Sequence, residues 1–170
     1  LFFPADPRAI SLWRLAAAFN ANDAAAAACL FAADGEWQVD ETVTWKGAAE
    51  IEAGLNGKFA EFKGLVRAEL GNLKGSPVLI LWRYTGGEKK RAGLVRTGRL
   101  RGWTLSKVYH DHRENLVKEA QPTGLMPYDP AFRFDANDCI RTPATAHTPD
   151  GGLSILYGQL APDGSVVKTA

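Results

Sequence analysis

Residues 15–40 read LAAAFNANDAAAAACLFAADGEWQVD, and this stretch decides the fold. An apolar helix ends at Asn20, and a second helix of almost pure alanine is predicted over Ala24–Ala33. A strand over Glu36–Val43 then carries an acid, Asp40, towards its end. The order of helix, helix and acid-bearing strand predicts the beginning of a cone-shaped sheet, with Asp40 on the inside of the cone.

Capping residues mark the boundaries of these helices. Asp6 and Pro7 open the first helix, because aspartate caps a helix N-terminus and proline suits its first position. Asp23 can cap the alanine helix, and Gly35 can end it. A third helix begins at Gly47, and its buried stripe recurs at steps of four, four and three: Ile51, Leu55, Phe59 and Phe62.

The apolar period changes from helical to alternating after Gly64. Four strands are predicted from it, over residues 65–70, 78–84, 92–99 and 103–111, with a hairpin turn at Gly86-Gly87. The fold class is therefore α+β: a curved, mostly antiparallel sheet wrapped as a cone around three N-terminal helices. We expect a cone domain over 1–115 and an irregular, proline- and glycine-rich extension over 116–170.

Bulk composition excludes several classes of partner. The chain has 20 basic and 19 acidic residues, so its net charge of +1 gives no reason to expect nucleic acid or a membrane surface. No apolar run is long enough to span a bilayer. The two cysteines, Cys29 and Cys139, fit no metal motif and form no disulfide framework, so a reducing, cytoplasmic location is expected. The basic run 89–91 indicates a solvated hairpin tip.

Residues 9–112 resemble the nuclear transport factor 2-like superfamily, which includes ketosteroid isomerases, SnoaL-like polyketide cyclases, scytalone dehydratase and members that only bind. The resemblance is carried by residues 15–40, by KGAAEIEAGLNGKFAEF and by VLILWRYTGG. It implies a cone that holds a small apolar or aromatic molecule without a cofactor, and a homodimer. Because this fold hosts many functions, the activity stays open.

The isomerase branch of that family implies a general base at Asp40. The same branch needs a tyrosine on the first helix and a second acid on a later strand, both donating to an enolate oxygen. Leu15 and Arg96 occupy those places, so both donors are absent there and the resemblance does not favour a steroid isomerase. The histidine pair of scytalone dehydratase is not reproduced by His110 and His112, which share one strand.

Asp40 and His110 are the candidate catalytic residues, each with a structural alternative. A carboxylate at an apolar cone mouth would have a raised pKa and could act as base, whereas at a solvated strand end it would not. His110 either exchanges protons with Asp40 or is a core histidine bonded to a carbonyl. His112 is expected at the surface, and no third ligand accompanies the pair, so no metal is expected.

Four further residues are candidate ligand contacts. Trp37, Trp82 and Tyr84 could line a pocket for an aromatic molecule, or simply pack the core. Arg96, if it points inward, needs an acidic partner such as Asp40 or an anionic ligand. If it points outward, it is a surface charge.

A second resemblance covers residues 137–170. GGLSILYGQLAPDGSVVKTA within it is similar to the start of the C-terminal domain of dihydroxy-acid and sugar-acid dehydratases. The iron–sulfur ligands of that family lie in an N-terminal domain with no counterpart here. This segment therefore raises the alternative of an inactive fusion or fragment.

The sequence favours small-molecule binding in an apolar cone pocket. Cofactor-independent proton transfer of the isomerase, cyclase or dehydratase type, with Asp40 as base, is a further possibility, so whether the protein is an enzyme stays open. The alternative from another class is a non-catalytic module that dimerises through a sheet face bearing Leu79, Leu81 and Val95.

Overall fold

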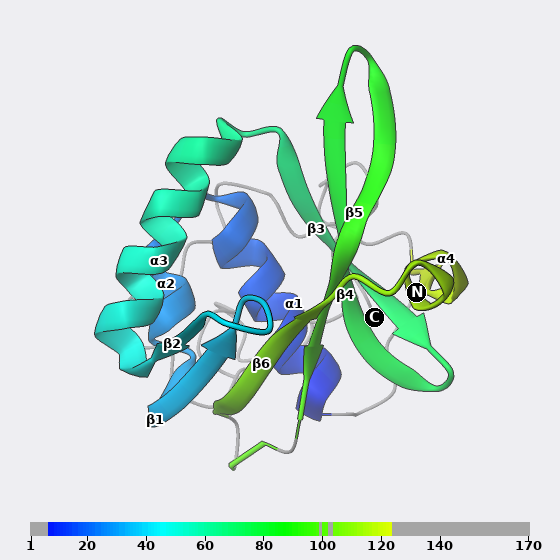
Figure 1. The fold of residues 1–170 in the computed structure, drawn as a ribbon. Helices are drawn as coiled ribbons and strands as arrows, with labels where there is room; N and C mark the ends of the chain where they lie inside the picture. The colour runs from blue at the N-terminus through cyan, green and yellow to red at the C-terminus, as the bar shows by residue number, and fades with distance from the viewer. Residues whose placement is uncertain (1–6, 99, 102–103, 124–170) are drawn as a thin grey trace, which may run out of the picture.

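The computed structural model describes residues 7–98, 100, 101 and 104–123 (Figure 1). Its helices are α1 (Pro7–Asn20), α2 (Ala24–Ala28), α3 (Gly47–Phe62) and α4 (Glu114–Glu119). Its strands are β1 (Phe31–Gln38), β2 (Thr44–Lys46), β3 (Val66–Leu73), β4 (Ser76–Thr85), β5 (Glu88–Thr97), β6 (Leu105–Asp111) and β7 (Gln121–Pro122).

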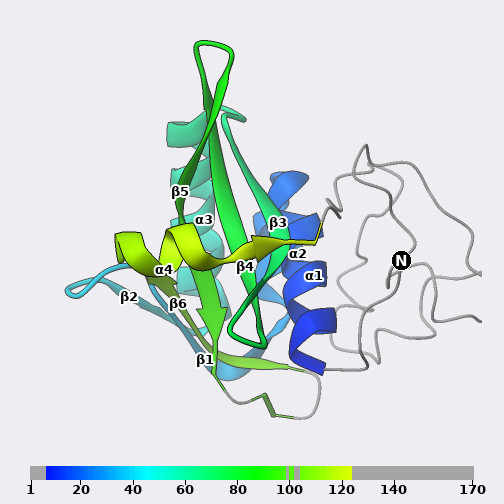
Figure 2. The same ribbon diagram turned by 90° about the vertical axis from the view of Figure 1, so that its right-hand side faces the viewer.

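The described strands form one curved sheet in the order β2-β1-β6-β5-β4-β3-β7. All neighbours are antiparallel except β1 and β6, which run parallel. Figures 1 and 2 show α1, α2 and α3 together on one side of the sheet, with α4 on the other. The α+β cone predicted from the sequence is confirmed.

The main core lies between the sheet and the first three helices. Leu12 and Leu15 of α1 are fully buried against it, and Asn20 fixes the end of α1 to β3. The Asn20 amide donates to the carbonyl of Ala68 at 2.9 Å and accepts from its N–H at 2.7 Å. This buried pairing satisfies both backbone groups at once.

The sheet face expected to form a dimer is part of this core. Leu79, Leu81 and Val95 all belong to the core cluster that includes α1. The expectation that they present an open face is wrong, because the alternation of β4 and β5 turns them towards the helices. A homodimer stays a prediction, but Leu79, Leu81 and Val95 cannot form its interface.

A second apolar cluster covers the opposite face of the sheet. Its sheet residues are Leu73, Val78, Ile80 and Leu94. Leu116, Val117 and Ala120, in and just after α4, close over them, and β7 then pairs with β3. The first residues of the expected extension thus pack on the cone. Residues beyond 123, with the dehydratase-like segment, lie outside the described part, and the domain division stays a prediction.

The alanine run is only partly helical. The predicted helix over 24–33 stops at Ala28, and β1 already begins at Phe31. Phe31 is buried and pairs with Leu105 of β6, so tertiary pairing overrides the helix propensity of alanine. Gly35 does not end a helix. It lies in a register shift of β1, where a Cβ would be only 2.9 Å from the Ala32 carbonyl oxygen.

Cys29, at the C-terminal end of α2, is disulfide-bonded. Among the described helices, none combines the length and apolar character needed to cross a membrane.

Candidate functional site

Strands β1, β2 and β6 bring three ring side chains together. Trp37 lies opposite Trp45 across the β1–β2 turn and opposite Val108 on β6. His110, two residues further along β6, therefore projects from the same face. The centroid of the Trp37 ring is 5.9 Å from that of Trp45 and 5.6 Å from that of His110. We call Trp37, Trp45 and His110 the ring cluster.

Further rings extend the cluster in both directions. Phe31 stacks on the inner side of Trp37, with centroids 5.8 Å apart and planes at 28°. His112 meets His110 edge to face at 5.7 Å and is exposed. The rings therefore form a continuous path from the buried core to the exposed end of β6.

Two nitrogens of the ring cluster are buried without a hydrogen-bond partner. They are Nε1 of Trp37, whose residue is 1% exposed, and Nε2 of His110. Trp13 of α1 has a third such ring nitrogen. A buried polar group without a partner costs about 1–3 kcal/mol, and native proteins seldom leave one so. These nitrogens are therefore unsatisfied polar groups within the buried part of the ring cluster.

Burial sets the protonation state of His110. Loss of solvent lowers its pKa from 6.5 to about 4, with smaller contributions from the charges of His112 and Lys58, and Asp40 opposes the change. His110 is therefore neutral at pH 7. In that form one ring nitrogen donates and the other accepts, so His110 can hydrogen-bond a hydroxyl or a carbonyl without carrying charge.

Asp40 lies in the exposed turn between β1 and β2. Its Oδ1 accepts hydrogen bonds from the Thr42 N–H at 2.7 Å, the Thr42 hydroxyl at 2.9 Å and the Val43 N–H at 2.8 Å. The Thr42 backbone bond is the largest cause of a lowered pKa at Asp40, followed by the Thr42 hydroxyl and Val43. The raised pKa expected from a buried position is wrong.

The structure nevertheless relates Asp40 to His110. The positive charge of Lys58 on α3 lowers the pKa of both residues. The charge of Asp40 raises the pKa of His110, against the larger effect of burial. The charge of Asp40 is the smallest of these influences on His110, and Asp40 lies at the surface whereas His110 is largely buried. The catalytic role of the pair stays a prediction.

Trp82 and Tyr84 do not share a face with Trp37. Trp82 packs against the second cluster, on the opposite side of the sheet, and Tyr84 follows it in the β4 alternation. The Trp82 indole donates to Glu69 Oε1 at 2.8 Å, and the Lys89 ammonium lies 4.1 Å from its ring. The expectation that all three aromatic residues line one pocket is wrong.

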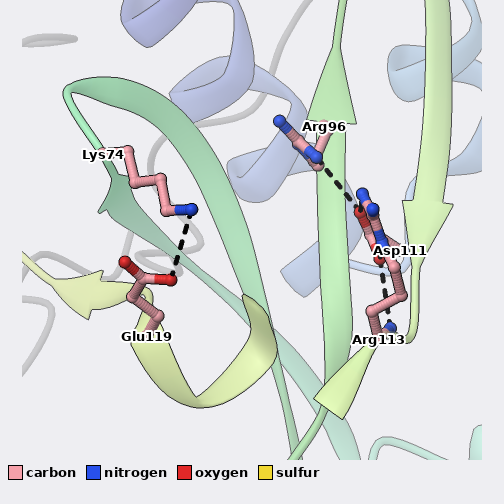
Figure 3. Close-up of polar contacts among 5 residues, drawn as sticks. All are labelled: Lys74, Arg96, Asp111, Arg113 and Glu119. Atoms are coloured by element: carbon pink, nitrogen blue, oxygen red, sulfur yellow. Dashed lines mark hydrogen bonds and ion pairs between the residues drawn. The ribbon is translucent and has the colours of Figure 1, made fainter. Parts of the chain in front are cut away.

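Arg96 is paired, but not with Asp40. Its Nη1 lies 3.1 Å from Oδ2 of Asp111, and Arg113 Nη2 lies 2.7 Å from the same oxygen (Figure 3). Asp111 is 6% exposed, and hydrogen bonds from Arg113 first, then from Arg96, hold its pKa far below the usual range. Arg96 therefore has the acidic partner that its charge requires, and that partner is Asp111 of β6.

Sequence reasoning missed Trp45 and Lys58. A hairpin centred on Glu41 would have placed Trp45 opposite Trp37, and the polar run 40–42 was the available signal. Over the described ranges, no three His, Cys, Asp or Glu side chains gather closely enough to hold a metal ion.

No protein-family model matches the sequence. The fold is similar to that of Bal32a from a soil-derived mobile gene cassette, with 18% identity, 68% of this chain and 95% of that chain covered, and a TM-score of 0.51. An NTF2-like protein with a cystatin-like fold from Novosphingobium aromaticivorans shows 19% identity over 62% and 81%, with a TM-score of 0.47.

A protein with a ketosteroid isomerase-like fold from Catenulispora acidiphila, solved in complex with trimethylamine, shows 18% identity over 63% of this chain and 88% of its own, with a TM-score of 0.47. Likeness at these identities concerns the fold alone. The architecture is the curved α+β cone that the sequence predicted, and its fold is similar to folds described as NTF2-like and ketosteroid isomerase-like.

Proposed function

We propose that this protein binds a small, uncharged, planar molecule against the ring cluster. The observation that carries the proposal is the pair of buried, unpartnered nitrogens on Trp37 and His110. A ligand with one oxygen could accept from the indole N–H, and a second polar group could pair with the imidazole. These two hydrogen bonds would offset the free-energy cost of burying the two nitrogens without partners.

The surroundings of these nitrogens select the kind of ligand. Aromatic rings offer flat apolar surfaces that favour a planar molecule. A charged ligand would lose its hydration in this buried place, and the neutral His110 would offer it no counter-charge. The proposed ligand class is therefore a neutral aromatic or conjugated molecule with a carbonyl or hydroxyl group.

Proton-transfer chemistry is the second candidate, supported by the charge of Asp40, which raises the pKa of His110 against the effect of burial. It would be a cofactor-independent isomerisation, cyclisation or dehydration. The low pKa of Asp40 makes it a weak base at neutral pH, which is why binding is the leading proposal. Asp40→Asn separates the two, since it would abolish turnover in an enzyme and leave binding at the ring cluster intact.

Acetophenone is a suitable probe, because it is planar and neutral and has one acceptor oxygen. We expect it to shift the Trp37 indole N–H resonance in NMR titrations. Styrene, which lacks the oxygen, should bind about tenfold more weakly, as expected for one lost hydrogen bond of about 1.4 kcal/mol. Benzoate, the charged analogue, should not bind.

Two variants assign this binding to the cluster. His110→Phe keeps a ring but removes the nitrogen, and should weaken a ligand that bridges both nitrogens, for which 2-hydroxyacetophenone is the probe. Trp82→Phe changes an indole on the opposite face and should have no effect. Equal losses in both variants, or no shift of the Trp37 resonance with either probe, would overturn the proposal.

A further inference from the structure

The outer edge of β5 is open where the hairpin extends beyond β6. Strand β6 pairs with β5 only over Leu94–Thr97. Among the described strands, none pairs with the same edge over residues 88–93, although β4 pairs with their other side. Figure 1 shows the β4–β5 hairpin projecting past the rest of the sheet. An open edge of this kind presents backbone donors and acceptors to another strand.

The direction of these backbone groups follows from the hydrogen bonds of β4. The Tyr84 N–H donates to the Leu65 carbonyl at 2.8 Å, so Tyr84 directs its backbone away from β5. Lys89 is the residue opposite Tyr84. In an antiparallel pair such a residue also points its N–H and C=O outward. Lys89, and by alternation Arg91, therefore offer their backbone groups to the open edge.

A cleft of about 420 Å³ runs beside this edge, between β5 and α4. Ala92 and Val117 give it an apolar part, and the remaining lining residues are Lys90, Arg91, His112, Glu114 and Lys118. A strand added to β5 would direct alternate side chains to either side of the sheet. The cleft can receive those that face α4.

The charge of the cleft is positive. Three lining residues are cationic, Lys90, Arg91 and Lys118, against one acid, Glu114, which pairs with Lys118 at 2.9 Å. Arg91 is held in place, because its guanidinium donates to the carbonyls of Val117 and Ala120. Its charge is therefore fixed at the cleft.

We propose that this edge binds an extended acidic peptide, which adds to the sheet beside β5 as a further strand. Backbone pairing supplies the affinity in this mode of recognition, and side chains supply the specificity. The basic run Lys89–Arg91 disfavours pairing of this edge with the same edge of a second copy of the chain, since like charges on neighbouring strands repel. The same run attracts glutamate or aspartate.

Lys89 permits a matched test of backbone pairing. Lys89→Pro removes an outward N–H without removing a hydrogen bond to β4, a place where proline is tolerated in an edge strand. Lys89→Ala removes the same charge and the same contact with Trp82 but keeps the N–H. The difference between the two variants therefore reports the backbone hydrogen bond.

The probe is the labelled peptide Ac-EVEVEVE-NH2, titrated with the full chain and followed by fluorescence anisotropy. We expect Lys89→Ala to weaken binding a few-fold and Lys89→Pro at least tenfold. The lysine counterpart of the peptide should not bind. A second control uses wild-type protein with the acidic peptide N-methylated at alternate residues, which should also fail to bind.

Three results would overturn the proposal. They are equal binding by the proline and alanine variants, equal binding of the N-methylated peptide, and peptide-independent dimerisation through this edge in analytical ultracentrifugation. The N-methylated peptide keeps the test valid if Lys89→Pro does not fold, because it leaves the protein unchanged.

Discussion

His110 connects the proposed binding site to the stability of the fold. Its imidazole is neutral because burial opposes the charge, and this preference exists only in the folded chain. In the unfolded chain the same ring has an ordinary pKa of about 6.5. Between pH 6.5 and about 4, the unfolded state therefore binds a proton that the folded state does not.

The free energy of unfolding should consequently fall as the pH is lowered through this window. The slope is at most about 1.4 kcal/mol per pH unit, so His110 costs about 2 kcal/mol at pH 5 relative to pH 7. His110→Gln should remove that loss. Urea unfolding at both pH values measures it, with His112→Gln, at the exposed neighbour, as control. An unchanged pH dependence in His110→Gln would contradict the prediction.

Two charged residues, one acidic and one basic, show how much a single sequence reveals about a side chain. The strand pattern placed Asp40 towards the end of a strand, whereas the structure places it in the turn after β1, where the Thr42 and Val43 amides donate to its carboxylate. An inward-pointing Arg96 is expected to need an acidic partner such as Asp40 or an anionic ligand, and the partner in the structure is Asp111. That pairing depends on the register of β5 and β6, which side-chain alternation alone does not fix.

At the scale of the element, α3 depends on a missing side chain. A Cβ on Gly54 would lie 2.2 Å from Cε2 of Trp45, so the helix can approach β2 only because residue 54 is glycine. Gly57, one turn further along the same helix, has no atom within 4 Å of such a Cβ. Both glycines therefore lie within the same helix, but only Gly54 is packed closely against a neighbouring side chain.

Alanine substitutions at these glycines should act in opposite directions. Gly57→Ala should raise the free energy of unfolding by about 0.5–1 kcal/mol through helix propensity. Gly54→Ala should lower it by about 1–3 kcal/mol through overpacking against Trp45. Chemical unfolding of both variants measures this, and tryptophan fluorescence reports the displaced ring. Equal stabilisation by both would show that Trp45 moves aside without cost.

Element prediction succeeded where a periodic pattern was long. Helices α1 and α3 carry apolar stripes with caps or a glycine start, and β3 to β6 are each seven to ten residues long. The predicted length of α2 was wrong, because alanine favours a helix but Leu30 and Phe31 are buried in the core and end it early. Strands β2 and β7 and helix α4 are too short for a period, and only tertiary contacts define them.

At the scale of the whole molecule, α4 acts as the cover of the second cluster. Leu116 and Val117 are each 8% exposed and shield the apolar face of β4 and β5. Arg91 binds the carbonyls at the end of α4, where a cation also complements the helix dipole. The cone is therefore incomplete without the residues that follow β6.

A chain that ends after Arg113 should be less stable than one that ends after Thr123. Exposing the cluster and removing two large apolar side chains should cost about 3–6 kcal/mol. Thermal unfolding of both chains, beside the full chain, measures the difference. The double variant Leu116→Ala and Val117→Ala in the full chain is the control for truncation itself. Equal melting temperatures for the two shortened chains would contradict the role of α4.

The parallel pairing of β1 with β6 also affects how the protein folds while it is being synthesised. Trp37 on β1 lies beside Val108 on β6, roughly seventy residues later in the chain. At about 5–20 residues per second, a ribosome needs about 4–14 s to supply that neighbour. During this interval β1 exposes Phe31 and Trp37 on a nascent chain whose sheet cannot close. Chaperone capture before residue 108 emerges, and release soon afterwards, would be the cellular signature of this topology.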